Sequence, residues 1–236
     1  MEQPSPDNRP PALGASRCVI IVAGGQGLRM GAGIPKQFLP LSGRPLLMHA
    51  MTPFIRYDAA IAIVVALPAA HIDRWQQLCE ACRFAVPHRT VAGGDTRTAS
   101  VRNALAVADA DFIAVHDGVR PLVSVDVIAR SFDTAALHGS AVPVIPVTDS
   151  LRKKTGDASH SIPRENICAV QTPQVFRADW LRIAYKDTAD AVFTDDASAV
   201  EAAGFALKLI DGSRDNIKIT EPDDLPVAET WMALRR

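Results

Sequence analysis

Short runs of apolar residues, many of them β-branched, alternate along the chain with longer segments in which apolar residues recur at helical spacing. The short runs predict strands at residues 19–22, 60–67, 89–91, 112–115 and 141–147, and the longer segments predict helices at 45–55, 72–84, 98–108 and 125–137. Strands that are apolar throughout and separated by helices are typical of a mostly parallel sheet covered on both faces. We therefore predict an α/β fold, with a Rossmann-like sheet between helices on both faces.

This pattern stops between residues 148 and 166, where few residues could join a core. Lys153-Lys154-Thr155-Gly156-Asp157 predicts a turn between two extended segments, so we expect residues 148–166 to form an arm that protrudes from the domain. Beyond the arm the pattern predicts helices at 178–186 and 194–203 and a strand at 205–210. Thr220-Glu221-Pro222-Asp223 has the spacing of a capping box with an early proline, and it predicts the start of a terminal helix.

Length and composition limit the class of protein. The chain has 236 residues, 48% of them hydrophobic, which suffices for one substantial core. Residues 1–16 are rich in proline and polar residues and predict a disordered leader, so the folded domain is expected to span 17–236. The formal net charge of −1 gives no general attraction to polyanions, and we expect neither nucleic acid nor membrane as a partner.

No apolar segment approaches the roughly 20 residues of a membrane-spanning helix, and the run at 18–23 is too short for a signal sequence. We therefore expect a cytoplasmic protein with reduced thiols. Cys79 and Cys82 have the spacing of a metal or redox pair, but no second pair of cysteines or histidines lies near them in the sequence. The sequence predicts no role for these two thiols.

A glycine-rich loop follows the first strand. It reads Val22-Ala23-Gly24-Gly25-Gln26-Gly27-Leu28-Arg29-Met30-Gly31, with Pro35-Lys36-Gln37 shortly after it. Glycines let a backbone approach phosphate oxygens and offer N–H donors, while arginine and lysine add positive charge. The loop lacks the last glycine and the later acidic residue of a dinucleotide motif, and Lys36 is not followed by the Ser or Thr of a Walker loop. It therefore predicts another kind of nucleoside triphosphate site.

Two further motifs follow predicted strands in the same way. Gly93-Gly94 comes after the strand at 89–91, and Asp117 comes after the strand at 112–115. Ligands of open α/β sheets bind beyond the carboxyl ends of the strands. We therefore expect both motifs to share one crevice with the glycine-rich loop.

Six motifs follow the loop in order. They are Gly93-Gly94-Asp95-Thr96-Arg97-Thr98-Ala99-Ser100-Val101, Val115-His116-Asp117-Gly118-Val119-Arg120-Pro121, Pro146-Val147-Thr148-Asp149-Ser150-Leu151, Gln171-Thr172-Pro173-Gln174, Thr194-Asp195-Asp196-Ala197-Ser198 and Asp215-Asn216-Ile217-Lys218-Ile219-Thr220. From Arg17 to the C-terminus the chain thus resembles the 2-C-methyl-D-erythritol 4-phosphate cytidylyltransferase family of sugar-phosphate nucleotidylyltransferases.

The resemblance implies a fold of the nucleotide-diphospho-sugar transferase type. It also implies an activity, the transfer of a cytidylyl group from CTP to 2-C-methyl-D-erythritol 4-phosphate with release of pyrophosphate, in the non-mevalonate isoprenoid pathway. Mg²⁺ is the implied cofactor, and the arm is implied to form a homodimer.

The resemblance also implies roles for individual residues. Arg29, Lys36 and Lys218 would stabilise the triphosphate and the transition state, and Arg164 would reach the acceptor phosphate from the arm of a second subunit. Nucleotide binding is implied for Ala23, Gly24, Gly25, Gly27, Gly93, Gly94, Asp95, Ser100 and Asp117, and acceptor binding for Gly118, Arg120, Ser150 and Thr172. Asp117 is the candidate for Mg²⁺, either directly or through water, unless it faces the ribose hydroxyls instead.

Two departures from the family pattern concern the nucleotide. Val22-Ala23-Gly24-Gly25 stands where many members have Pro-Ala-Ala-Gly, and Ala99 stands where they have an acidic residue. Recognition of cytosine by backbone groups would survive both changes.

Two other functions stay open. A ribitol-5-phosphate cytidylyltransferase shares most of the motifs, although Asp149-Ser150 and Thr194-Asp195-Asp196-Ala197-Ser198 favour the erythritol enzyme. A non-catalytic nucleotide-binding protein has no physical reason to keep Arg29, Lys36 and Lys218.

Overall fold

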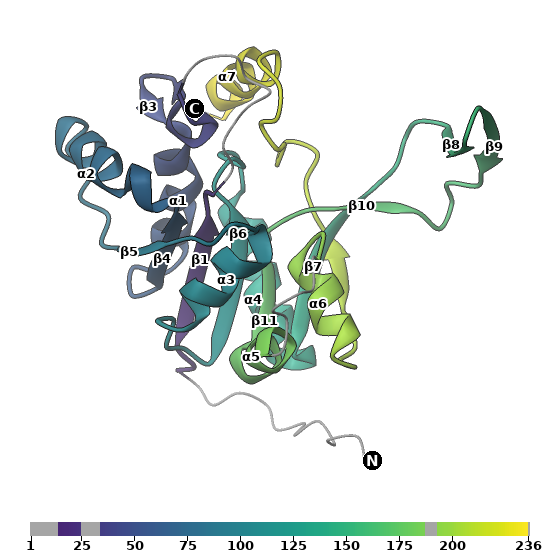
Figure 1. The fold of residues 1–236 in the computed structure, drawn as a ribbon, viewed down its shortest axis with the longest axis horizontal. Coiled ribbons are helices and arrows are strands. Elements are labelled where there is room, and N and C mark those ends of the chain that lie inside the picture. Colours follow the sequence, from purple (N-terminus) through teal and green to yellow (C-terminus); the bar gives the residue numbers. More distant parts are fainter. Residues whose placement is uncertain (1–13, 25–33, 187–192, 236) are drawn as a thin grey trace.

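An eight-stranded sheet forms the centre of the protein (Figure 1). The computed structural model describes residues 14–24, 34–186 and 193–235. The strands follow one another in the order β10-β7-β11-β6-β1-β4-β5, and β12 pairs with β7. Their bounds are Arg17–Val22 (β1), Ala62–Leu67 (β4), Arg89–Ala92 (β5), Phe112–Asp117 (β6), Ser140–Pro146 (β7), Cys168–Val170 (β10), Gln174–Arg177 (β11) and Leu209–Asp211 (β12).

The sheet is mostly parallel, as predicted. Strands β5, β4, β1 and β6 pair parallel to one another, and β12 pairs parallel to β7. Because β11 is antiparallel to both β6 and β7, the strand β7 runs in the same direction as β6. Only β10 and β11 run in the opposite direction among the described strands of this sheet.

Helices cover both faces of the sheet (Figure 1). Alternate residues of a strand point to opposite faces, and Val19 and Ile21 of β1 pack with helices α1, α2 and α4, whereas Cys18 and Ile20 pack with α3, α5 and α6. The helices span Leu46–Tyr57 (α1), Ile72–Ala81 (α2), Arg97–Leu105 (α3), Val125–His138 (α4), Ala178–Lys186 (α5) and Asp196–Ala202 (α6). The predicted α/β fold is therefore confirmed.

A smaller core lies under the terminal helix α7, Asp224–Leu234. It contains Leu39, which follows the 3₁₀ helix η2, Lys36–Phe38. It also contains Leu41 from the hairpin of β2, Pro40–Leu41, and β3, Arg44–Pro45. The predicted capping box at Thr220 is wrong, because α7 begins only at Asp224 and its N-cap residue, Asp223, makes no side-chain cap. Instead the Asp224 carboxylate accepts the N–H groups of Thr220 and Glu221 and the Thr220 hydroxyl, so the chain turns before the helix begins.

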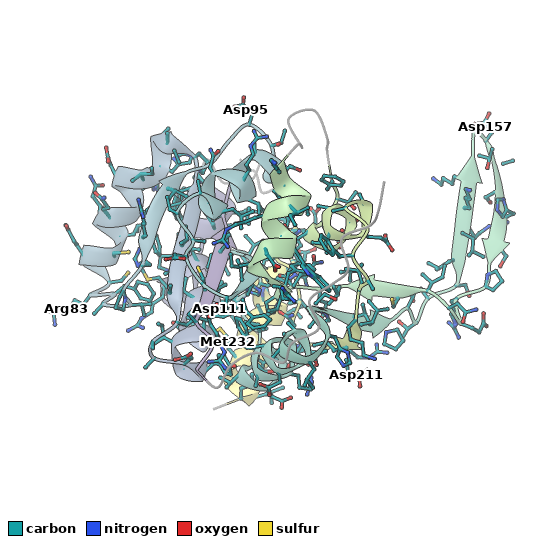
Figure 2. The ribbon with its side chains drawn as sticks, turned by 90° about the horizontal axis from the view of Figure 1, so that it is seen from below. Arg83, Asp95, Asp111, Asp157, Asp211 and Met232 are labelled. Atoms are coloured by element: carbon teal, nitrogen blue, oxygen red, sulfur yellow. The ribbon has the colours of Figure 1, made fainter. Side chains whose placement is uncertain are left out.

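The predicted arm is a β-hairpin that stands clear of the body (Figure 1). Strands β7 and β10 form its antiparallel base, and β8, Leu151–Thr155, pairs with β9, Ala158–Ile162, at its end. A two-residue turn joins β8 to β9, and Gly156 has a φ of 60° there, which glycine adopts without strain. Figure 2 shows Asp157 of this turn at the far tip, away from the other labelled residues.

The remaining differences from the sequence prediction are local. The strand expected at 205–210 forms only at Leu209–Asp211. Residues 1–13 of the expected leader lie outside the described residues, but Ser16 is bound to the fold, because its N–H and hydroxyl both donate to the Asp111 carboxylate. Within the part of the chain that the structure describes, no helix is both long and apolar enough to cross a membrane.

Candidate functional site: a cleft at the carboxyl ends of the strands

A cleft of about 820 Å³ opens where β1, β4, β5 and β6 end. Its lining comes from the segments after these strands, from η2 and from the loop before α7: Val22, Ala23, Gly24, Lys36, Gln37, Pro68, Ala69, Gly93, Gly94, Asp95, Thr96, Arg97, Ser100, Asp117, Val119 and Lys218. The structure thus brings together Ala23, Gly24, Lys36, Gly93, Gly94, Asp95, Ser100, Asp117 and Lys218, as the sequence predicts.

The strand register delivers these residues to one place. Val22 lies opposite Asp117 where β1 pairs with β6, and Leu67 lies opposite Ala92 where β4 pairs with β5. The pairing continues past the strand ends, since the Gly93 N–H donates to the Leu67 carbonyl at 2.7 Å. For the described residues, Ala23 and Gly24 at the start of the loop, Gly93-Gly94 and Asp117, the expected common crevice at the carboxyl edge of the sheet is confirmed.

The turn after β5 requires its two glycines. A Cβ on Gly93 would lie 2.9 Å from the Ser100 Oγ, and a Cβ on Gly94 would lie 2.4 Å from the Ala99 Cβ. Ser100 accepts the Gly94 N–H at 3.1 Å, and the Thr96 hydroxyl accepts the Ala99 N–H and caps α3. The turn therefore holds its backbone against the start of α3, and Gly93, Gly94 and Asp95 line the cleft there.

Asp117 forms the floor of the cleft and faces three cations. Its Oδ2 lies 2.9 Å from the Lys218 Nζ and 3.4 Å from the Arg120 Nε, and its Oδ1 lies 3.8 Å from the Arg97 Nε. Burial alone would raise the pKa of this carboxyl, but Lys218, Arg97 and Arg120 together hold the pKa well below its usual range. Asp117 is therefore a permanent anion that positions cations around it.

A chain of hydrogen bonds below Asp117 fixes the backbone there. The Asp117 N–H donates to the Thr172 Oγ1 at 3.0 Å, and the His116 ring lies 3.1 Å from both that Oγ1 and the Arg120 carbonyl. Because the carbonyl can only accept, His116 carries its proton on Nε2, and its Nδ1 accepts the Thr172 hydroxyl. Burial lowers the pKa of His116 to about 4, so the ring is neutral.

Several predicted acceptor residues do not line the cleft. Arg120 and Thr172 are buried beside Asp117, and Arg120 donates from Nη1 to the Asn216 carbonyl at 2.8 Å. Gly118 is packed against Ala23 and Leu47. The side chains of Arg120 and Thr172 are buried and hydrogen-bonded within the protein, so they support the floor of the cleft rather than face its interior.

The arm residues also lie away from the cleft. Ser150 is exposed, and Arg164 is an exposed residue whose Nη1 donates to the Thr148 carbonyl of the same arm. Neither belongs to the lining of the cleft. Gly25, Gly27 and Arg29 of the glycine-rich loop lie outside the described residues.

Two features of the site have no counterpart in the sequence prediction. Gln37 donates from Nε2 to the Ala23 carbonyl at 2.8 Å and thereby ties η2, with Lys36, to the end of β1. Arg97 lines the cleft and makes two hydrogen bonds with the buried Asp196, at 3.1 and 2.6 Å. Both Arg97 and Asp196 lie in motifs seen in the sequence, but nothing in a linear pattern pairs residues 99 positions apart.

The fold and the cleft define an α/β protein with a nucleotide-type site at the carboxyl edge of its sheet. Residues 17–234 match the family described as IspD, 2-C-methyl-D-erythritol 4-phosphate cytidylyltransferase. The chain is 48% identical over 215 residues to the protein of that name from Bacteroides thetaiotaomicron, covering 91% of this chain and 98% of the relative. It is 50% identical over 215 residues to the one from Porphyromonas gingivalis, covering 90% and 96%.

Solved structures give the same result. The enzyme of this name from Thermus thermophilus superposes with a TM-score of 0.77 at 34% identity, covering 91% of this chain and 98% of that chain. The one from Francisella tularensis gives a TM-score of 0.76 at 31% identity, covering 92% and 99%. The chain belongs to the 2-C-methyl-D-erythritol 4-phosphate cytidylyltransferase family.

Proposed function

We propose that the protein transfers the cytidylyl group of CTP to 2-C-methyl-D-erythritol 4-phosphate and releases pyrophosphate, as a step of the non-mevalonate isoprenoid pathway. Family membership supports the reaction. The observation that carries it in the structure is the meeting of Lys36 and Lys218 with the Gly93-Gly94 turn in one cleft. A reaction between a triphosphate and a phosphate requires cations beside the phosphates, and a glycine turn lets the substrate come close to the backbone.

The reaction needs positioning and positive charge rather than a covalent nucleophile. A phosphate oxygen of the acceptor attacks the α-phosphorus of CTP, the bond from that phosphorus to the β-phosphate oxygen breaks, and pyrophosphate leaves with the electron pair. Negative charge increases on the oxygens around the α-phosphorus and on the leaving group. Lys218, held by Asp117, would stabilise the former, and Lys36 together with Arg29 would stabilise the leaving pyrophosphate.

Cytosine would be recognised mainly by backbone groups. The proposed base site lies between Ala23-Gly24 and the Gly93-Gly94 turn, with Ser100 behind both. Asp95 is an exposed residue of the cleft lining, and its carboxylate would accept hydrogen bonds from the ribose or from the edge of the base. Fixed backbone donors and acceptors discriminate strongly, because a wrong base leaves them unpaired.

Mg²⁺ is part of this proposal, with a limited role for the protein. Among the described residues, no group of three or more His, Cys, Asp or Glu side chains could hold a metal ion. Both oxygens of Asp117 already face cations, so its carboxylate fits contact with Mg²⁺ through water rather than direct ligation. Mg²⁺ usually binds with substrate phosphates and keeps several waters, and it would neutralise part of the triphosphate charge.

The acceptor side of the proposal includes a second copy of the chain. Arg120 and Thr172 would shape the floor of the acceptor site, and Ser150 would contribute its hydroxyl. Arg164, on the arm, would reach the acceptor phosphate of a partner in a homodimer, since it lies away from its own cleft. A cytoplasmic location stays a prediction from the sequence.

Pyrophosphate release with CTP and Mg²⁺ tests the function. With 2-C-methyl-D-erythritol 4-phosphate as acceptor we expect turnover, and with ribitol 5-phosphate we expect a much lower kcat/KM. A higher kcat/KM for ribitol 5-phosphate would favour the alternative cytidylyltransferase. CTP binding without turnover on either acceptor would support a non-catalytic nucleotide-binding protein.

A further inference from the structure

An ion pair at the back of the cleft has no role in the function proposed above. Arg97 begins α3, and its guanidinium donates to both oxygens of Asp196, the first residue of α6. The Asp196 carboxylate has no exposed surface, and the Tyr185 hydroxyl on α5 donates to its Oδ1 at 2.7 Å. A buried carboxylate with three donors is firmly held, because losing any donor would leave a buried charge poorly compensated.

The same guanidinium also faces Asp117. Its Nε lies 3.8 Å from the Asp117 Oδ1, whereas its Nη2 lies 2.6 Å from the Asp196 Oδ2. Arg97 therefore stands between two carboxylates, close to the buried one and farther from the one on the cleft floor. On its other oxygen Asp117 keeps Lys218 at 2.9 Å.

This unequal sharing has a consequence for Lys218. A bidentate contact is the strongest arrangement between a guanidinium and a carboxylate. Without the charge of Asp196, the next carboxylate within reach of Arg97 is Asp117. A tight pair between Arg97 and Asp117 would compete with Lys218 for the same anion and would displace its ammonium group.

We propose that Asp196 and Tyr185 are positioning residues that hold Arg97 back from Asp117 and so keep Lys218 in place in the cleft. Arg97 directly follows the Gly93–Thr96 turn, and Asp117 ends β6, so the position of Arg97 affects both of these parts of the cleft. The expected effects on kcat rest on the proposed function. The position of Arg97 between Asp196 and Asp117 can be tested by structure determination, without measuring activity.

The kinetic test compares Asp196→Asn with the double variant Arg97→Gln/Asp196→Asn. The single variant keeps the shape of the side chain but frees Arg97, so kcat should fall by about 10- to 100-fold through misplacement of Lys218. The double variant removes the unbalanced cation as well, and its kcat should exceed that of the single variant by about 3-fold or more. A double variant as slow as the single variant, or slower, would overturn the proposal, because two purely structural losses would add.

Tyr185→Phe provides an independent test if Asp196→Asn folds poorly. It removes one donor from the Asp196 carboxylate and should lower kcat by about 3-fold, with KM for CTP nearly unchanged. Asp126→Asn and Tyr57→Phe are matched controls, because Asp126 forms an exposed pair with Arg130 and Tyr57 stacks on Phe132 away from the cleft. An effect of Tyr185→Phe no larger than that of Tyr57→Phe would contradict the proposal.

Crystal structures of the wild type and Asp196→Asn separate this inference from the function. We expect the guanidinium in the variant to lie within about 3.2 Å of the Asp117 carboxylate, with the Lys218 Nζ moved away. An Arg97 that stays on residue 196 would overturn the inference even if the wild type is active. An inactive wild type would refute the proposed function and leave this structural comparison to decide the inference.

Discussion

Asp117 and Lys218 form the ion pair on which the proposed chemistry of the cleft depends. The ammonium group lies 2.9 Å from the carboxylate, yet the Lys218 side chain keeps 42% of its surface exposed. Asp117 therefore fixes the position of Lys218 without burying it. A cation so held costs little reorganisation when negative charge develops beside it.

Removing the Lys218 charge should damage turnover more than binding. In Lys218→Met we expect kcat to fall by about 10² to 10³, the loss typical of one preorganised transition-state donor. Lys36→Ala should lower kcat by a similar factor. Steady-state pyrophosphate release measures both, and Lys208→Met is a matched control because Lys208 is exposed and outside the cleft lining. A variant that keeps more than about half of the wild-type kcat would rule out the proposed role.

Gly93 tests the backbone recognition of the nucleotide. Its substitution by alanine would place a Cβ 2.9 Å from the Ser100 Oγ, so the turn and Ser100 must move apart. In Gly93→Ala we expect KM for CTP to rise by about 10-fold or more and the preference for CTP over UTP to narrow. In Gly24→Ala the new Cβ would meet the same Oγ at 3.4 Å, an ordinary contact, so its effect should be clearly smaller. Because Gly24 lines the same proposed base site, equal effects would show that the clash with Ser100 is not the cause.

Among the elements, the connection between β10 and β11 supports Asp117. β10 and β11 lie along β7 with a shift of two residues between Val170 and Val175, and Thr172 lies in that break. The break turns the Thr172 hydroxyl toward the end of β6, where it joins the Asp117 N–H to His116. Asn216, before Lys218, donates from Nδ2 to the Thr172 carbonyl at 2.8 Å and ties the last loop to the same point.

The buried His116 should make this region sensitive to acid. Its pKa is lowered from 6.5 to about 4 by burial, so the folded state binds fewer protons than the unfolded state. Its contribution is fully present above pH 6.5 and is lost as the pH falls toward 4. By pH 5 this group alone should reduce the free energy of unfolding by about 2 kcal/mol relative to pH 8.

Denaturant unfolding of the wild type and His116→Gln at several pH values measures this effect. The amide of glutamine can both donate and accept, as the neutral ring does, but it does not titrate. The variant should therefore be less stable than the wild type at pH 8, and the difference should shrink by about 2 kcal/mol at pH 5. Parallel pH curves for the two proteins would show that His116 is not the group responsible.

The sequence could predict the helices and strands because their signal is local. Periodicity is decided by neighbours along the chain, and the helix predicted at 178–186 is the one observed as α5. The terminal cap could not be predicted, since Asp223 and Asp224 both offer a carboxylate and only the path of the chain selects Asp224. The pairing of Arg97 with Asp196 was equally inaccessible, because it forms when α3 and α6 pack on the same face of the sheet.

The site residues show the same difference between what neighbours along the chain decide and what distant contacts decide. Residues at or directly after the ends of parallel strands, such as Asp117 and Gly93, were predictable because the ends of such strands meet at one edge. Arg120 and Thr172 belong to matching motifs, but their burial depends on hydrogen bonds to Asn216 and His116 from distant segments. A motif can therefore place a residue near a site without showing whether it faces the ligand or supports the wall.

In the molecule as a whole, the arm extends away from the body (Figure 1). β8 and β9 are exposed along nearly their whole length, and they pair with each other. Arg164 lies at the base of this hairpin, outside the lining of its own cleft. A two-fold dimer that exchanges identical arms would carry each Arg164 to the cleft of the other copy.

Mixing two inactive variants tests this exchange. Arg164→Ala lacks the arm residue, and Lys36→Ala lacks a cation of the cleft. In a mixed dimer one site would combine an intact Lys36 with an intact Arg164 from the other chain, while the second site would carry both defects. Random assortment makes about half of the dimers mixed, so about a quarter of the wild-type activity per site should return.

The control mixes Lys36→Ala with the double variant Lys36→Ala/Arg164→Ala, because no pairing of these chains has an intact Lys36 and recovery should be absent. Differently tagged chains purified together would confirm that subunits exchange. A guanidinium can bind a phosphate through two parallel hydrogen bonds, which lysine cannot reproduce. When Arg164→Ala is mixed with Lys36→Ala/Arg164→Lys, little activity should therefore return, and Arg164→Lys alone should be nearly as slow as Arg164→Ala. Confirmed exchange without recovery above the two parent variants would mean that Arg164 does not serve the neighbouring site, and the arm would then need another explanation than a shared active site.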